Sequence, residues 1–180
     1  SIGREITLQI LSLRPKKIVA IDFSEPNLFE LKNILLKNKN ETTLVCCELG
    51  STADYKFIHK VFKKHKPDIL FHASAYKHVE LLEENKIEGI KNNIRSTFFL
   101  SKIAFEFKTK KFILISSDKA VRPSSLMGVT KRISELIVSC YAQKSINSNN
   151  EIKQVFSMVR FGNVLGSSGS VVPIFQKQIE

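Results

Sequence analysis

The feature that most constrains the fold is a regular alternation of short apolar runs with longer amphipathic segments. The short runs are rich in Ile, Val, Leu and Phe, as expected of strands in a parallel sheet that is covered on both faces. Strands and helices in regular succession indicate a doubly wound α/β domain. We expect strands at Lys17–Asp22, Thr43–Glu48, Ile69–Ser74, Phe112–Ser117 and Gln154–Arg160. We expect helices near Ile2–Leu13, Asn27–Lys37, Tyr55–Lys64, Lys86–Phe107 and Met127–Lys144.

The sequence opens on a helical pattern, with no strand before it. In a Rossmann-type doubly wound sheet the first strand is central and lies between the second and the fourth. The expectation is therefore a Rossmann-type parallel sheet that lacks its first strand and is broken between Lys17–Asp22 and Ile69–Ser74. Residues 1–180 are predicted to be one partial nucleotide-binding domain, a fragment of a longer protein. Its N-terminal strand and C-terminal substrate region would lie outside this sequence.

The charge is strongly basic, with 28 Lys and Arg against 17 Asp and Glu and a formal net charge of +11. Nucleic acid, an anionic substrate or a membrane surface would each suit such a charge. The lysines do not form one arm with interleaved aromatic residues, so a solvated surface is the preferred interpretation and a nucleic-acid binder ranks last. The chain has no run of 18 apolar residues, the minimum for a membrane-spanning helix. Three cysteines, an odd number, favour a reduced, cytoplasmic setting.

Gly3 and Asp22 suggest the nucleotide end of a site. Gly3 opens the first helix, where a glycine lets the helix pack closely on the sheet and its N-terminus attracts a pyrophosphate. Asp22 follows 19 positions later at the end of a strand, the expected place for a carboxylate that holds ribose hydroxyls. Such an acid favours NAD over NADP, although basic neighbours could reverse that preference. Asp22 could instead be a turn or cap residue before Ser24, which we count with it as a cofactor contact.

The next two strand ends add further candidates for contacts to a dinucleotide. Glu48 ends a strand where such folds often hold the adenine edge, and Leu49 follows it. Ala73 and Ala75 are small enough to let the backbone approach a flat cofactor. His72 is more often a core histidine than a ligand, and no second His or Cys lies at metal spacing, so no metal site is predicted.

The most informative stretch lies at the carboxyl end of the expected strand Phe112–Ser117. Open α/β sheets bind their ligands beyond the carboxyl ends of their strands. Ser117, Asp118 and Lys119 stand at this end, and Met127 and Lys131 follow on the next helix. Because Met127 and Lys131 are four residues apart, they face the same side of that helix.

These residues carry a family resemblance. The matching segments are HASAYKHVELLEEN, KNN, ISSDKAVRPSSLMGVTKR and VRFGNVLGSSGSVVPIF. They resemble the polysaccharide-biosynthesis branch of the extended short-chain dehydrogenases, which includes UDP-N-acetylglucosamine 4,6-dehydratases. The similarity runs in order through essentially the whole chain. It implies bound NAD or NADP, a UDP-sugar substrate and a redox-neutral loss of water.

The resemblance also implies roles for single residues. Asp118 matches the acid that protonates the leaving C6 hydroxyl, and Lys119 matches the base that takes the C5 proton. Ser117 matches the residue that hydrogen-bonds the sugar 4-oxygen, and Lys131 matches the lysine on the nicotinamide ribose. A base must be neutral and an acid protonated, so the pair could titrate as one unit. Met127 replaces the usual tyrosine, as in membrane-associated members of the branch, which leaves the base for the C4 hydroxyl unassigned.

Other matching positions are assigned to substrate binding or support. Asn93 matches an asparagine that supports the active site from the long helix. Asn163 is a candidate contact to the sugar-nucleotide phosphates or acyl group, and Ser167 belongs to a run that offers backbone donors to an anion. Lys77 could meet the diphosphate, although its segment could equally be an ordinary loop.

The sequence is thus interpreted as a nucleotide-sugar 4,6-dehydratase acting on UDP-N-acetylglucosamine for surface polysaccharide or glycan synthesis. The alternatives are an epimerase of the same superfamily and a non-catalytic cofactor-binding paralogue. We expect a homo-oligomer. The parent protein is expected in the cytoplasm or on the cytoplasmic face of the inner membrane, attached through segments outside this chain.

Overall fold

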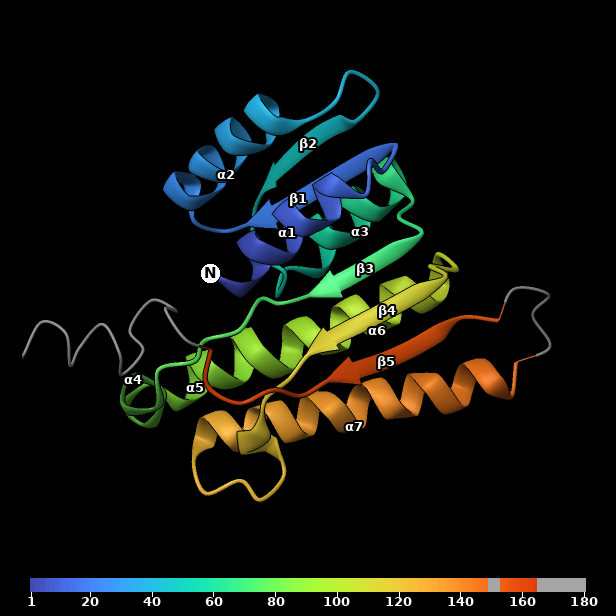
Figure 1. Cartoon of the computed structure of the whole chain (residues 1–180). Helices are drawn as coiled ribbons and strands as arrows, with labels where there is room; N and C mark the ends of the chain where they lie inside the picture. Colours follow the sequence, from blue (N-terminus) through green and yellow to red (C-terminus); the bar gives the residue numbers. More distant parts are fainter. Residues whose placement is uncertain (149–152, 165–180) are drawn as a thin grey trace, which may run out of the picture.

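The structure is a computed structural model that describes residues 1–148 and 153–164. Figure 1 shows its parallel strands with helices on both sides. The strands in the described residues are β1 (Lys17–Asp22), β2 (Leu44–Leu49), β3 (Ile69–His72), β4 (Lys111–Ile115) and β5 (Val155–Val159). The α-helices are α1 (Ile2–Ser12), α2 (Glu25–Asn38), α3 (Tyr55–His65), α4 (Val79–Glu84), α5 (Lys86–Ile90), α6 (Ser96–Glu106) and α7 (Leu126–Ile146). The alternation of strands and helices predicted from the sequence is confirmed.

The strands form two parallel ladders. β1 pairs with β2, so that Asp22 lies opposite Leu49, and β3, β4 and β5 pair in that order. Within the described residues no ladder joins β1 to β3, so the break expected between these two strands is confirmed. The strands within each ladder are parallel, and Figure 1 shows the arrowheads of both ladders pointing the same way, so the carboxyl ends of all these strands lie along one edge.

Two apolar cores lie on opposite faces of the strands. Leu11 of α1 and Leu35 of α2 pack with Ile18 on one face of β1. On the other face, Phe62 of α3 packs in a larger cluster that joins α6 and α7 to β4 and β5. Strand residues alternate between the two faces of the sheet. Ile18 and Ile21 of β1 are three positions apart and so point to opposite faces: Ile18 packs in the first core, and Ile21 packs at the edge of the second.

One predicted helix, Lys86–Phe107, is interrupted in the structure. α5 ends at Ile90, a π-helical turn occupies Lys91–Arg95, and α6 begins at Ser96. Hydroxyl groups of α6 bond the carbonyls of this turn: Ser96 donates to Asn92 O, and Thr97 donates to Asn93 O. Side-chain hydroxyls that bond the carbonyl four residues earlier compete with the regular helical ladder, and single π-turns often mark functional sites. The short helix α4 was not predicted from the sequence.

β3 and β4 end two residues before the predicted strands do. Ser74 and Ser117 therefore lie beyond the ladders, at the carboxyl edge. The other strand boundaries agree with the predicted ones to within one residue, which is inside the usual ambiguity of such boundaries.

Candidate active site

The polar residues after β4 fold into a 3-10 turn at Asp118–Ala120. The Ser117 hydroxyl donates to Asp118 Oδ1 at 2.8 Å, and the Lys119 backbone N–H donates to the same oxygen at 2.8 Å. The bond from Ser117, followed by that from Lys119, holds the pKa of the Asp118 carboxyl below its ordinary value. The Asp118 side chain is therefore ionised at neutral pH in this structure.

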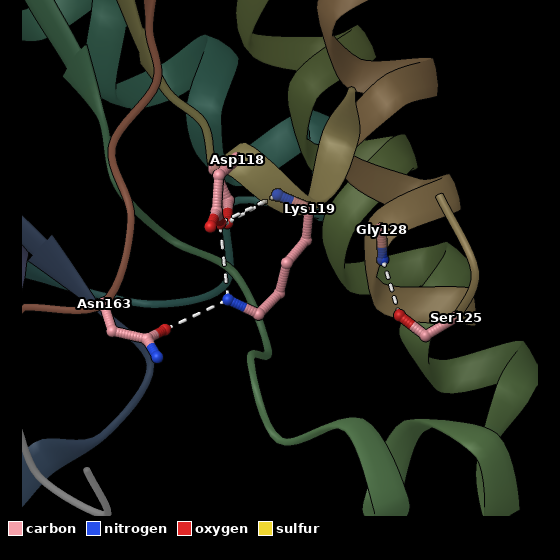
Figure 2. A network of polar contacts seen from close by, with 6 residues as sticks. Asp118, Lys119, Ser125, Gly128 and Asn163 are labelled. Atoms are coloured by element: carbon pink, nitrogen blue, oxygen red, sulfur yellow. Dashed lines mark hydrogen bonds and ion pairs between the residues drawn. The ribbon is translucent and has the colours of Figure 1, made fainter. Parts of the chain in front are cut away.

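The Lys119 ammonium lies between acceptors from two strand exits. Its Nζ is 3.3 Å from Asp118 Oδ1 and donates to Asn163 Oδ1 at 3.0 Å, as Figure 2 shows. The backbone of Asp118 is tied to the same exit, because its N–H donates to Phe161 O at 3.1 Å. Both members of the Asp118–Lys119 pair are well exposed, so a ligand can reach them. The structure thus brings together three residues that the sequence predicted for one site.

Helix α7 begins beside this turn and carries Met127 and Lys131. Met127 is 5% exposed, so its thioether belongs mainly to the packed interior. Lys131 Nζ donates to Ile115 O at the end of β4, at 2.9 Å. Burial lowers the pKa of Lys131 to about 8, against an opposing effect of Glu135. Lys131 is therefore anchored to the strand that delivers Asp118 and Lys119.

Gly128 was not recognised from the sequence, yet the turn requires it. A Cβ built at Gly128 would lie 2.6 Å from the Lys119 carbonyl oxygen and 3.2 Å from Pro123 Cβ. The Gly128 N–H donates to Ser125 Oγ at the N-cap of α7, as seen in Figure 2. Any side chain here would push the first turn of α7 away from Lys119. The sequence sign of this close approach was a glycine in the first turn of a predicted helix.

On the predicted cofactor side, Asp22 and Gly3 lie at the expected strand and helix ends. Asp22 Oδ1 accepts the Ser24 N–H at 2.9 Å, so the carboxylate orients the turn that begins α2. This contact matches the turn interpretation of Asp22 and leaves the ribose interpretation a prediction. A Cβ at Gly3 would meet Ala73 Cβ at 3.6 Å, which places the start of α1 against the exit of β3. Ala75 follows in the same partly buried loop.

Glu48 and Leu49 end β2, but Glu48 has protein partners. Its Oε1 accepts hydrogen bonds from Lys64 Nζ and His65 Nε2, both at 2.7 Å. These bonds, that from Lys64 first, lower the pKa of the Glu48 carboxyl. The carboxylate therefore ties β2 to the last turn of α3, and its contact to adenine stays a prediction. Leu49 remains exposed beside Asp22.

His72 is a core histidine, as the sequence favoured. It is 3% exposed, its Nε2 lies 2.9 Å from Thr97 Oγ1, and its Nδ1 lies 3.2 Å from Ser74 Oγ. Burial, followed by the charge of Lys131, lowers its pKa to about 3. The ring is therefore neutral at every physiological pH.

Asn93 supports the loop after β3 from the π-helical turn. It is 1% exposed; its Oδ1 accepts the Tyr76 N–H at 2.8 Å, and its Nδ2 donates to Tyr76 O at 3.1 Å and to Thr130 Oγ1 at 3.0 Å. One side chain thus fixes the backbone of Tyr76 and links it to α7. The supporting role expected for Asn93 has a structural basis in these contacts.

A buried carboxylate, Glu135, was missed by the sequence reasoning. It is 1% exposed and accepts hydrogen bonds from Ser116, Arg132 and Arg160. The Arg160 guanidinium first, with Ser116 and Arg132, outweighs burial and holds the pKa of Glu135 at about 2. The sequence signal was a Glu four residues after Lys131, on the same face of the helix.

Two further residues were predicted to bind substrate, Lys77 and Ser167. Lys77 lies exposed in the loop between β3 and α4, and Ser167 lies outside the described residues. In residues 1–148 and 153–164, no group of three or more His, Cys, Asp and Glu side chains could hold a metal ion. No helix in that part of the chain is long and apolar enough to cross a membrane.

Comparison with known sequences gives a family match across the whole chain. The model of the family described as "Polysaccharide biosynthesis protein" matches residues 1–180. The probable polysaccharide biosynthesis protein EpsC of Bacillus subtilis is 40% identical over 180 residues, which is 100% of this chain and 29% of that protein. A UDP-N-acetylglucosamine 4,6-dehydratase (inverting) of Campylobacter jejuni is 35% identical, over 99% of this chain and 51% of its own length.

Solved structures show the same fold. Pen from Bacillus thuringiensis superposes with a TM-score of 0.86 at 31% identity, covering 99% of this chain and 52% of that one. A UDP-glucose 4-epimerase of Thermotoga maritima superposes with a TM-score of 0.78 at 20% identity, over 99% of this chain and 59% of that one. The chain spans between 29% and about half of the length of the curated relatives named above. The match across all 180 residues places it in a family: the chain belongs to the polysaccharide biosynthesis protein family.

Proposed function

We propose that the protein containing this chain is an NAD(P)-dependent nucleotide-sugar 4,6-dehydratase that acts on UDP-N-acetylglucosamine in polysaccharide synthesis. The observation that carries the proposal is the Asp118–Lys119–Asn163 cluster at the carboxyl edge of a doubly wound sheet. It places an exposed carboxylate and an exposed amine side by side where such sheets bind their ligands. The similarity to a named UDP-N-acetylglucosamine 4,6-dehydratase supports the choice of reaction.

The residues at the start of α1 and at the carboxyl ends of β1 and β3 fit a dinucleotide. Gly3 brings the start of α1 to the small residue Ala73, and Asp22 ends β1 with its carboxylate accepting the Ser24 N–H. Gly3 and the first turn of α1 would face the pyrophosphate, Asp22 a ribose, and Lys131 the nicotinamide ribose. When bound, the nicotinamide would accept a hydride from sugar C4 and return it to C6, so no outside oxidant is needed.

The Asp118–Lys119 pair would supply the acid and the base. Oxidation at C4 acidifies the C5 proton, which neutral Lys119 can remove while protonated Asp118 delivers a proton to the leaving C6 hydroxyl. In the free protein the pKa of Asp118 is held below its ordinary value, and Lys119 Nζ lies 3.3 Å from its Oδ1. Transfer of one proton from Nζ to Oδ1 across that contact would give the neutral pair without any external proton. Covering the pair with substrate removes water and favours the neutral form.

Ser117 and Asn163 would position the sugar. The Ser117 hydroxyl, now on Asp118 Oδ1, can turn to the 4-oxygen, and Asn163 can exchange Lys119 for a polar group of the substrate. The Met127 thioether cannot accept a proton, so the C4 hydroxyl proton goes to water or to another side chain. Lys77 and Ser167 are proposed contacts to the diphosphate. The homo-oligomer and the membrane attachment through segments outside this chain stay predictions.

The test is incubation of the full-length protein with UDP-N-acetylglucosamine, followed by mass spectrometry of the nucleotide sugar. The proposal expects a product lighter by one water. An epimerase is the second candidate, because UDP-glucose 4-epimerase of Rickettsia canadensis is 34% identical over 132 residues. That alternative predicts a product of unchanged mass. A nucleotide sugar that remains unaltered would overturn both and favour a non-catalytic protein.

A further inference from the structure

We propose that Glu135 is a positioning residue that holds the two strand exits of the active site in register through one buried carboxylate. The structural part of this inference stands on contacts in α7, β4 and β5. Its kinetic part rests on the dehydratase function proposed above. Neither the family match nor the named relatives assign a role to this residue.

Glu135 contacts both exits directly. Its Oε1 accepts the Ser116 hydroxyl at 2.7 Å and Arg160 Nε at 2.7 Å, and its Oε2 accepts Arg160 Nη2 at 2.7 Å. A paired geometry of this kind fixes both the distance and the plane of the two groups. Arg132, one turn earlier on α7, adds a bond to Oε2 at 3.1 Å. Each carboxylate oxygen is thus shared by two donors.

The anchored residues immediately precede the reactive ones. Ser116 directly precedes Ser117, Asp118 and Lys119, and Arg160 lies three residues before Asn163. At the anchors the Ser116 N–H donates to Val159 O at 2.8 Å, and beyond them the Asp118 N–H donates to Phe161 O at 3.1 Å. The two exits then meet at the Lys119–Asn163 hydrogen bond.

Helix α7 therefore hydrogen-bonds the end of β4 from two successive helical turns. Lys131 bonds Ile115 O and Glu135 bonds Ser116, so residues four apart on the helix hold the last residue of β4 and the residue after it. Rotation or sliding of β4 against α7 would break both contacts. A displacement of about 1 Å at a reacting group can reduce the rate about 100-fold, so a register held this tightly matters for catalysis.

The burial of the three charged groups is unequal. The Glu135 side chain is 1% exposed, whereas those of Arg160 and Arg132 are 39% and 44% exposed. Loss of either arginine would weaken the pairing of a buried anion, but loss of the Glu135 charge leaves two cations that can turn to water. Glu135→Gln keeps the size of the side chain and an acceptor for Ser116. This variant is therefore expected to fold.

The experiment compares full-length wild type with Glu135→Gln and with Glu106→Gln, a control with the same chemical change at an exposed position of α6. Two measurements are made on each: kcat and KM for dehydration of UDP-N-acetylglucosamine, and the acetylation rate of the Lys119 amine by limited labelling and peptide mass spectrometry. We expect kcat of Glu135→Gln to fall about 10- to 100-fold with little change in KM. We also expect Lys119 to be acetylated several-fold faster, because its bonds to Asp118 and Asn163 loosen. Glu106→Gln should match wild type in both.

A double variant separates positioning from stability. Glu135→Gln with Arg160→Gln removes one of the two cations left without their carboxylate, and it is expected to regain melting temperature without regaining kcat. Unchanged Lys119 labelling in Glu135→Gln would overturn the positioning role, whether or not the protein is a dehydratase. Recovery of kcat together with melting temperature in the double variant would also overturn it. A wild type that does not dehydrate the sugar would overturn the proposed function alone, since the labelling result stands without turnover.

Discussion

At the scale of single residues, His72 is a neutral imidazole enclosed between Thr97 and Ser74. Its pKa of about 3 lies below the value of 6.5 for a free histidine. Between these values the unfolded chain binds a proton that the folded chain does not, so stability falls as pH drops below 6.5, by up to about 1.4 kcal/mol per pH unit. We expect His72→Gln to flatten this slope between about pH 5 and pH 6.5. Glu135 affects the pH dependence at lower pH: its pKa is lowered from 4.5 to about 2, so the stability that it contributes is lost as pH falls between these values.

Urea unfolding of the full-length protein at several pH values measures that slope. The matched control is His78→Gln, at an exposed position just before α4, and it should leave the slope as in wild type. A wild type whose stability does not change between about pH 5 and pH 6.5 would contradict the neutral, buried state of His72.

Lys119 is the residue whose loss should affect chemistry most directly. In the proposed reaction it removes the C5 proton, and a positioned general base contributes about 10²- to 10⁴-fold to a rate. Lys119→Met should therefore lower kcat by about that factor while dinucleotide binding remains. Exchange of the C5 hydrogen with deuterated water, followed by NMR, reports on this step separately from turnover. Lys60→Met, at an exposed position of α3, is the control; exchange that persists in Lys119→Met would assign the base elsewhere.

At the scale of elements, the π-helical turn at Lys91–Arg95 is expected to be a stability determinant of the site. Asn93→Ala would remove the bonds to Tyr76 N, Tyr76 O and Thr130 Oγ1. Leaving such groups without partners costs about 1–3 kcal/mol each at most, so we expect a loss of about 2–4 kcal/mol in unfolding free energy. Urea unfolding measures the loss, and hydrogen exchange should show a faster Tyr76 amide. Asn38→Ala, which removes one exposed bond to Ile34 O, should cost much less; an equal cost would refute the special role of the turn.

The sequence reveals some of these elements better than others. β1 and α3 were predicted within a residue, because an apolar run and an amphipathic period leave little choice of boundary. The π-turn was hidden, since one inserted residue hardly changes the helical pattern, and Ser96 and Thr97 were its main signs. Glu135 was hidden for another reason: a glutamate in a helix usually faces solvent, and its partner Arg160 lies 25 residues away, directly after β5. Contacts of that range are set by the packing of the whole sheet.

At the scale of the whole molecule, parallel strands explain why the candidate site could be predicted at all. Their carboxyl ends meet at one edge, so residues 44 positions apart, Lys119 and Asn163, were expected together and do bond. What the sequence could not supply was the pairing within the free protein: Asn163 Oδ1 accepts a hydrogen bond from Lys119, and Glu48 accepts one from Lys64 of α3. The contacts of Asn163 to substrate and of Glu48 to adenine stay predictions. Periodicity places side chains on an edge, whereas their partners depend on rotamers and on neighbours from other elements.

Dinucleotide binding at this edge can be tested on the full-length protein through its melting temperature. A ligand that binds the folded state alone stabilises it by about 2.7 kcal/mol at 100 times its Kd. Asp22 carries a negative charge beside the predicted ribose, so NAD⁺ should raise the melting temperature more than NADP⁺, whose extra phosphate meets that charge. Asp22→Asn should narrow the difference, chiefly by weakening NAD⁺. Asp68→Asn, in an exposed ion pair with Lys110 at the far ends of the strands, should keep the preference of wild type. A wild type stabilised more by NADP⁺ than by NAD⁺ would show that Asp22 serves its turn and Ser24, and that basic neighbours set the choice of cofactor.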